Sequence, residues 1–148
     1  MSAPGTATSL SIVLTGSGGA GVMTAGQTLL ETATSCGLYG LMTRSTGPQI
    51  RGGEAAAMLR LSTQPVQCPG DKFDILLALD FENIQRFAAE LPLDAKSVII
   101  ADPADGDMPA FLKASGATAG YIEMKKLAKA VPGGRVSIAR YSAICSRE

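Results

Sequence analysis

The chain has 148 residues, which is enough for one domain with a substantial core, and its formal net charge is zero. With no surplus of basic residues, it lacks the electrostatic footprint expected of a nucleic-acid-binding protein. It contains no histidine, which excludes Ser-His-Asp triads, Cys-His dyads and the commoner zinc sites from this chain acting alone.

Residues 1–9 are small and polar and have neither the basic region nor the apolar stretch of a signal peptide. We expect them to form a flexible leader to a single domain over residues 10–148. No apolar run is long enough to span a membrane, so no membrane partner is expected. The odd number of cysteines without an export signal fits a reducing cytoplasm.

A short apolar run, Ser11 to Thr15, is typical of a buried parallel strand, and a glycine-rich turn follows it. Gly16, Gly18 and Gly21 fit the spacing G-x-G-x-x-G. The unpaired N–H groups at the start of the next helix suit an anion. A turn of this kind can also serve only close packing of helix on strand, so both interpretations stay open. No Lys-Ser or Lys-Thr follows the last glycine, which argues against a nucleoside-triphosphate P-loop.

The next elements are a helix over residues 21–36, for which Gly37 is the expected stop, and an apolar strand over residues 38–42. A ribose would be held by Asp or Glu at the end of this second strand. Thr43 and Arg44 stand there instead. Arg44 could receive a ribose phosphate, which leaves an NADP-like function open as an alternative.

Residues 43–53 contain Gly-Pro and Gly-Gly and are predicted to form a loop. Arg44 and Arg51 lie in this loop together with Gln49, and the planar fork of arginine suits carboxylate or phosphate. The pattern favours a ligand-binding or interface role. The alternative is a solvated loop with two salt-bridging arginines.

The rest of the chain alternates strands and helices. Residues 54–62 alternate like a strand with one wetter face, and its direction relative to the first strand stays open. Asp80 is expected to cap a helix. The predicted elements are strands over 73–79, 97–101 and 118–122 and helices over 81–91, 109–114 and 124–131. This order predicts a three-layer α/β domain with a mostly parallel sheet and a Rossmann-like glycine turn.

Charged residues make up 18% of the chain, against about 25% in an average soluble domain, which indicates a subunit that buries surface against partners. An ordinary alanine-rich monomer is the alternative. Cys36, Cys68 and Cys145 are far apart and form no C-x-x-C pair, so they predict neither an iron–sulfur cluster nor a redox pair.

Two motifs together resemble the gamma domain of 2-oxoacid:ferredoxin oxidoreductases, the pyruvate and 2-oxoglutarate enzymes. They are the glycine turn, Gly16-Ser17-Gly18-Gly19-Ala20-Gly21-Val22, and the loop Gly47-Pro48-Gln49-Ile50-Arg51-Gly52-Gly53-Glu54-Ala55. The strand that ends at Asp80 is also similar to that family. The resemblance covers about residues 10–131 and is strongest to the form in which the gamma domain opens a fused gamma-alpha subunit.

The resemblance implies a non-catalytic part of a cytoplasmic complex that oxidatively decarboxylates a 2-oxoacid to an acyl-CoA and reduces ferredoxin. It implies alpha and beta subunits or domains as partners, with thiamine diphosphate and the iron–sulfur clusters held by them. This chain would frame the approach of CoA, with no cofactor held by it alone and with no catalytic or metal-binding residue of its own. The candidate cofactor contacts are Gly16, Ser17, Gly18, Gly19, Gly21 and Arg51, followed by Arg44 and Gln49.

The sequence departs from the family pattern at residues 135–148, which match poorly. Either the domain is excised or shortened, or its C-terminal packing differs. Two other functions remain open. One is a stand-alone dinucleotide-binding protein of the NADP type, and the other is a purely structural interaction domain.

Overall fold

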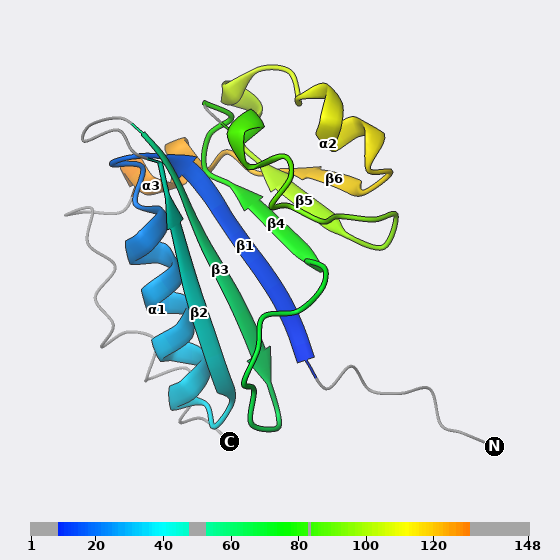
Figure 1. Ribbon diagram of the computed structural model, residues 1–148. Coiled ribbons are helices and arrows are strands. Elements are labelled where there is room, and N and C mark those ends of the chain that lie inside the picture. The colour runs from blue at the N-terminus through cyan, green and yellow to red at the C-terminus, as the bar shows by residue number, and fades with distance from the viewer. Residues whose placement is uncertain (1–8, 48–52, 83, 131–148) are drawn as a thin grey trace.

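The computed structural model describes residues 9–47, 53–82 and 84–130, which form one sheet with helices on both sides (Figure 1). The six strands lie in the order β2-β3-β1-β4-β5-β6. Their bounds are β1 (Ser9–Ser17), β2 (Tyr39–Thr46), β3 (Glu54–Ser62), β4 (Ile75–Ala78), β5 (Val98–Ala101) and β6 (Thr118–Tyr121).

Strand β3 runs antiparallel to both of its neighbours, β1 and β2, while the pairs β1–β4, β4–β5 and β5–β6 are parallel. Five strands therefore point the same way, which confirms the mostly parallel sheet. The direction of β3, which the sequence left open, follows from the short connection between β2 and β3, because a parallel pair would need a longer crossover.

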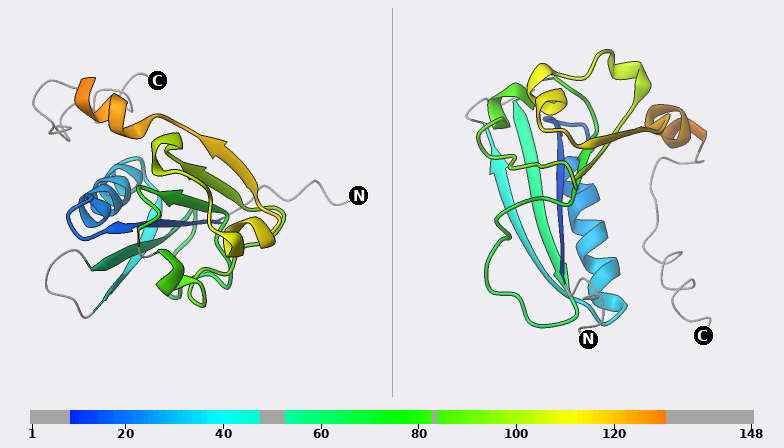
Figure 2. Two further views of the ribbon diagram at one scale, coloured as in Figure 1. Left: turned by 90° about the horizontal axis from the view of Figure 1, so that it is seen from above. Right: turned by 90° about the vertical axis from the view of Figure 1, so that its right-hand side faces the viewer.

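Helix α1 (Val22–Ser35) lies on one side of the sheet (Figure 2). The 3-10 helix η1 (Ile84–Phe87) and α2 (Ala110–Ala114) lie on the other side, and α3 (Met124–Ala130) lies on the same side as α1. A second 3-10 helix, η2 (Pro103–Asp105), follows β5. The expected three layers are confirmed. No helix in the described ranges has the length and apolar character needed to cross a bilayer.

Each face of the sheet carries its own apolar cluster, as the alternation of side chains along a strand requires. In β1, Val13 belongs to the cluster beneath η1 and α2, and its neighbour Leu14 belongs to the cluster beneath α1. Both side chains are almost completely buried. The helix of the second cluster packs closely, because a Cβ added at Gly26 would lie 2.8 Å from the Cβ of Ala57.

The predicted boundaries of α1 are confirmed to within a residue. Gly21 precedes the helix with a φ of 88°, in the left-handed region. At the other end, the N–H of Leu38 donates to the Ala33 carbonyl and the N–H of Gly37 donates to the Thr34 carbonyl. This is the Schellman pattern that Gly37 indicates.

Three sequence expectations about boundaries are wrong. The strand expected over 38–42 continues to Thr46, because Thr43 to Thr46 pair with β3 although their side chains are polar. Strand β1 continues through Gly16 and Ser17, which pair with Ala55 and Glu54, so the turn proper begins at Gly18. Strand pairing outweighs local composition in both cases.

The third error concerns the helix expected over 81–91, of which the structure shows only η1. The expected cap, Asp80, accepts hydrogen bonds from Ser17 of β1, as described below, and caps no helix in the described residues. Ile84, Phe87 and Leu91 still reach the core, but they do so from a single 3-10 turn and the irregular chain that follows it. The apolar spacing therefore predicted correctly which residues are buried, but the helix that it predicted is wrong.

Candidate functional site

The glycine turn and the end of the Arg-Gly-Gly loop lie side by side at one edge of the sheet. The N–H of Gly18 donates to the carbonyl of Gly53 over 2.6 Å. In the strand register, Ser17 of β1 lies opposite Glu54 of β3. The two motifs that the sequence singled out are therefore joined by backbone contacts, although Gln49 and Arg51 themselves lie outside the described residues.

The glycines of the turn have local structural causes. The carbonyl of Ser17 accepts from the N–H of Ala20, which closes a tight turn, and Gly19 within it has a φ of 99°. A Cβ at Gly16 would lie 3.0 Å from a methyl carbon of Val22, so this glycine lets the start of α1 approach β1. The first N–H groups of α1 have no partner within the helix.

The carboxylate of Asp80 binds the beginning of the glycine turn. One oxygen accepts from the Ser17 hydroxyl over 2.8 Å, and the Ser17 backbone N–H lies 2.9 and 3.1 Å from the two oxygens. Asp80 also accepts the N–H of Glu82 over 3.0 Å. The backbone N–H and the hydroxyl of Ser17 are therefore already bonded to a carboxylate of the protein itself.

The role of Asp80 at the turn was missed, although a signal for it existed in the sequence. Asp80 directly follows a buried strand, and the carboxyl ends of neighbouring parallel strands meet at one edge of a sheet. The residues that follow Asp80 predict only that it caps a helix, and they carry no information about its contact with β1. Its main partner, Ser17, is 63 positions away in the chain.

A cleft of about 780 Å³ opens at this edge, at the carboxyl ends of β1, β4 and β5. After β1 the chain passes through α1 to β2, and after β4 it passes to β5 on the other side, so the cleft lies at a topological switch point. Switch points are where open α/β sheets usually bind ligands. The lining residues come from the end of β1 and the turn after it, from the segment after β4, from η2 and from α3: Ser17, Ala20, Leu79, Asp80, Phe81, Glu82, Ala104, Asp105, Met124, Lys125 and Ala128.

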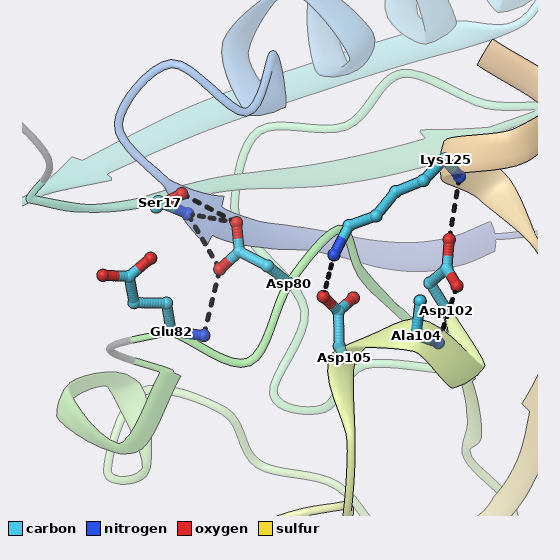
Figure 3. A network of polar contacts seen from close by, with 7 residues as sticks. All are labelled: Ser17, Asp80, Glu82, Asp102, Ala104, Asp105 and Lys125. Atoms are coloured by element: carbon cyan, nitrogen blue, oxygen red, sulfur yellow. Dashed lines mark hydrogen bonds and ion pairs between the residues drawn. The ribbon is translucent and has the colours of Figure 1, made fainter. Parts of the chain in front are cut away.

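Charged side chains link η2 to α3 along one wall of the cleft (Figure 3). Lys125 at the start of α3 reaches Asp105 of η2 with its ammonium group. The carboxylate of Asp102 accepts the backbone N–H of Lys125 over 2.8 Å and that of Ala104 over 2.9 Å. Asp102 therefore fixes η2 against α3.

These contacts shift two pKa values. The backbone N–H groups of Lys125 and Ala104 hold the pKa of Asp102 below its usual value. The hydrogen bond to Asp105 raises the pKa of Lys125 above its usual value, and the nearby charges of Asp105, Asp102 and Asp80 add to the effect. Both groups therefore stay charged at neutral pH.

The charge of the cleft does not favour phosphate. Asp80, Glu82 and Asp105 contribute three carboxylates to its lining, and Lys125 contributes one ammonium, which leaves two negative charges in excess. A cleft lined by one sign of charge attracts the opposite sign. In the described ranges, no group of three or more His, Cys, Asp or Glu side chains could hold a metal ion.

Arg44 lies away from the glycine turn. It belongs to β2, opposite Ala57 of β3, whereas Ser17 at the turn lies opposite Glu54. Its guanidinium donates to the side-chain oxygen of Gln27 on α1 over 3.1 Å. The structure therefore does not bring Arg44 together with the candidate contacts of the glycine turn.

Glu54, at the end of the loop motif, is a residue that the sequence placed on the wetter face of its strand. It is buried, and its carboxylate pairs with Arg86 of η1 over 2.9 Å. A Cβ at Gly47 would lie 2.2 Å from the carboxyl carbon of Glu54, so this side chain fills the base of the loop. The expected wetter face of β3 is confirmed at Met58 and Arg60, which are half-buried, and is wrong at Glu54 and Ser62, which are buried at the two ends of this central strand.

Comparison with known proteins gives a consistent result. The family model described as pyruvate ferredoxin/flavodoxin oxidoreductase matches residues 11–145. The 2-oxoglutarate synthase subunit KorC of Methanothermobacter marburgensis is 34% identical over 94 residues, which are 62% of this chain and 50% of that protein. The chain thus spans about half the length of this curated relative.

Solved structures resemble the fold. The 2-oxoglutarate:ferredoxin oxidoreductase of Magnetococcus marinus, solved with 2-oxoglutarate, coenzyme A and succinyl-CoA bound, matches with a TM-score of 0.69 and 25% identity over 82% of this chain and 21% of that chain. The gamma subunit of a keto/oxoacid ferredoxin oxidoreductase from Geobacter sulfurreducens matches with a TM-score of 0.62 and 24% identity, over 82% of this chain and 65% of that chain.

Proposed function

The chain belongs to the pyruvate ferredoxin/flavodoxin oxidoreductase family, and we propose that it is the gamma-type subunit or domain of a 2-oxoacid:ferredoxin oxidoreductase. In this role it supplies no reacting group. It packs against the alpha and beta subunits that hold thiamine diphosphate and the iron–sulfur clusters, and it helps to frame the approach of CoA. The observation that carries the proposal is the family match over residues 11–145.

The geometry of the turn supports this proposal at the level of the site. The backbone contact between Gly18 and Gly53 fixes the end of the Arg-Gly-Gly loop beside the glycine turn. A loop anchored there would present Arg51 and Gln49 near the turn, where a planar guanidinium suits the phosphates of CoA. The proposed CoA contacts are Gly16, Ser17, Gly18, Gly19, Gly21, Gln49 and Arg51, with Arg44 the weakest of the set because of its contact with Gln27.

Reconstitution tests the proposal. The chain is coexpressed with candidate thiamine-binding alpha and beta subunits from the same organism, and complex formation is followed by size-exclusion chromatography. We expect a stable complex that oxidises a 2-oxoacid only when CoA and ferredoxin are present, with 2-oxoglutarate as the first substrate to assay because two of the relatives are 2-oxoglutarate enzymes. The isolated chain should show no turnover. A chain that associates with no such subunit would contradict the proposal.

A purely structural role for the glycine turn is the second candidate, and one observation favours it. Several donors of the turn are used within the protein, by the carboxylate of Asp80 and the carbonyl of Gly53. A stand-alone NADP-binding function gains less support, because Arg44, the residue expected to receive the ribose phosphate, is distant from the turn. Calorimetry with NADPH and NADH decides this point, and saturable binding well below millimolar would reverse the order.

A further inference from the structure

The cleft at the carboxyl ends of β1, β4 and β5 contains an unsatisfied acceptor. The side chain of Asp105 is 8% exposed, and one of its oxygens pairs with the ammonium of Lys125. Its other oxygen, Oδ2, is buried and has no hydrogen-bond partner among the described residues. A buried carboxylate oxygen without a donor has lost its hydration without compensation. Asp105 therefore has the capacity for one more donor, which can reach Oδ2 only when a side chain that covers this oxygen moves aside.

The surroundings of Asp105 select for a positively charged donor. Asp80 and Glu82 line the same cleft, so its lining contains three carboxylates and the single ammonium of Lys125. Glu82 is exposed and its carboxylate points away from Lys125 and Asp105, so Asp80 is the carboxylate nearer to that pair (Figure 3). Because no described set of side chains there is suited to a metal ion, the complementary group is an organic cation.

Lys125 pairs with Asp105, but a guanidinium would form more hydrogen bonds with the same carboxylate. An ammonium is a point charge and satisfies one carboxylate oxygen here, whereas the planar fork of arginine donates two parallel N–H groups to both oxygens. The side chain of Lys125 is 50% exposed, so it can swing into solvent when a competing donor arrives.

We propose that this cleft receives an arginine side chain of a partner subunit, whose guanidinium bonds both carboxylate oxygens of Asp105 and displaces Lys125. The inference rests on the proposed function, because it requires the assembled oxidoreductase complex. It adds the surface on this chain that the partner recognises and the chemistry of the group that enters. The acidic lining supplies the charge complementarity, and the volume of about 780 Å³ accommodates the side chain together with the residues that carry it.

The test measures association of the full-length chain with its partner subunits by biolayer interferometry. Asp105→Asn should weaken association at least about tenfold, because it leaves an entering guanidinium without its full counter-charge. Asp107→Asn is the matched control, since Asp107 is exposed, lies two residues away and does not line the cleft. It should leave the dissociation constant within about twofold of the unsubstituted chain.

Lys125→Gln gives the distinguishing result. If Lys125 competes with the partner for Asp105, its removal should strengthen association severalfold. If the Lys125–Asp105 pair only holds η2 against α3, both substitutions should weaken association together. Thermal melts of each variant report folding, and the Lys125→Gln result decides the question even if Asp105→Asn folds poorly.

Equal dissociation constants for Asp105→Asn and Asp107→Asn would overturn the inference and leave the proposed function intact. Weaker association of Lys125→Gln would also overturn it. If the unsubstituted chain binds no partner subunit, both the proposed function and this inference fall. Opposite effects of the Asp105 and Lys125 substitutions support it.

Discussion

At the scale of single residues, the sheet contains one hydroxyl that its surroundings do not satisfy. Thr15 is fully buried in β1, and its Oγ1 has no hydrogen-bond partner among the described residues. Its neighbours Val13 and Leu14 are apolar and equally buried. Burial of an unpaired hydroxyl is unfavourable, and a branched apolar side chain of the same shape would fit the position.

We therefore expect Thr15→Val to stabilise the fold, by about 1 kcal/mol, because the substitution removes the unpaired hydroxyl and keeps the shape of the side chain. Urea denaturation followed by circular dichroism measures the change in the free energy of unfolding. Thr24→Ala, at an exposed position of α1, serves as a control and should change stability by less than about 0.5 kcal/mol. A loss of stability in Thr15→Val would mean that Oγ1 makes a bond in solution.

Asp102 gives a prediction about pH. Its pKa is lowered because the backbone N–H groups of Lys125 and Ala104 donate to its carboxylate. A carboxyl whose pKa falls on folding stabilises the protein above its unfolded pKa, near 3.9, and this contribution is lost as the pH falls through the lower folded pKa. Asp102→Asn should therefore melt lower than the unsubstituted chain at pH 7, with a gap that narrows below about pH 4.

Differential scanning calorimetry between pH 3 and pH 7 measures that gap. Asp107→Asn is again the control, because it makes the same chemical change at an exposed position. A gap for Asp102→Asn that stays constant across this range would mean that its hydrogen bonds to η2 and α3 contribute nothing through the charge.

At the scale of elements, the close packing of α1 on the sheet requires a glycine, which has no side chain, at position 26. A Cβ at Gly26 would lie 2.8 Å from the Cβ of Ala57, and this atom belongs to a central strand that cannot move aside. Gly26→Ala would add about 1 kcal/mol of helix propensity, but overpacking against rigid structure costs about 1–3 kcal/mol. We expect net destabilisation, measured by chemical denaturation, whereas a net gain would show that α1 can move outward.

Elements with a strong apolar period could be read from the sequence, and those defined by distant partners could not. The boundaries of α1 follow from its spacing and from Gly37, both of which are local signals. The extension of β2 to Thr46 depends on pairing with β3, which no local pattern reports. The helix expected after β4 fails because Asp80 binds Ser17, a contact across 63 positions of sequence.

The candidate site, like the fold, could be predicted from the sequence only in part. The sequence singled out the glycine turn and the Arg-Gly-Gly loop, and the contact between Gly18 and Gly53 joins their described ends. The acidic cleft was not expected, because Asp105 and Lys125 belong to separate elements that meet only when β5 and β6 pair. Charged residues that only the fold brings together have no regular spacing in the sequence by which they could be recognised.

At the scale of the whole molecule, one face of the protein carries two surfaces with different proposed tasks. The loop motif anchored at Gly53 is proposed to approach CoA, and the cleft around Asp105 is proposed to bind a partner subunit. Because Ser17 binds Asp80 at the cleft and also pairs opposite Glu54, the two surfaces share the end of β1. Binding at one surface should therefore leave the position of the other largely fixed.

The last prediction separates the CoA role from a purely structural one. In the assembled complex, Arg51→Ala should raise the KM for CoA about tenfold or more, because a guanidinium bonded to a phosphate contributes on the order of 1.5–3 kcal/mol. Arg44→Ala should change it by less than about threefold, since Arg44 bonds Gln27 on α1. Steady-state assays with CoA as the varied substrate measure both, and the KM for the 2-oxoacid should not move in either variant. An unchanged KM for CoA in Arg51→Ala, with the complex intact, would assign the loop to subunit packing alone.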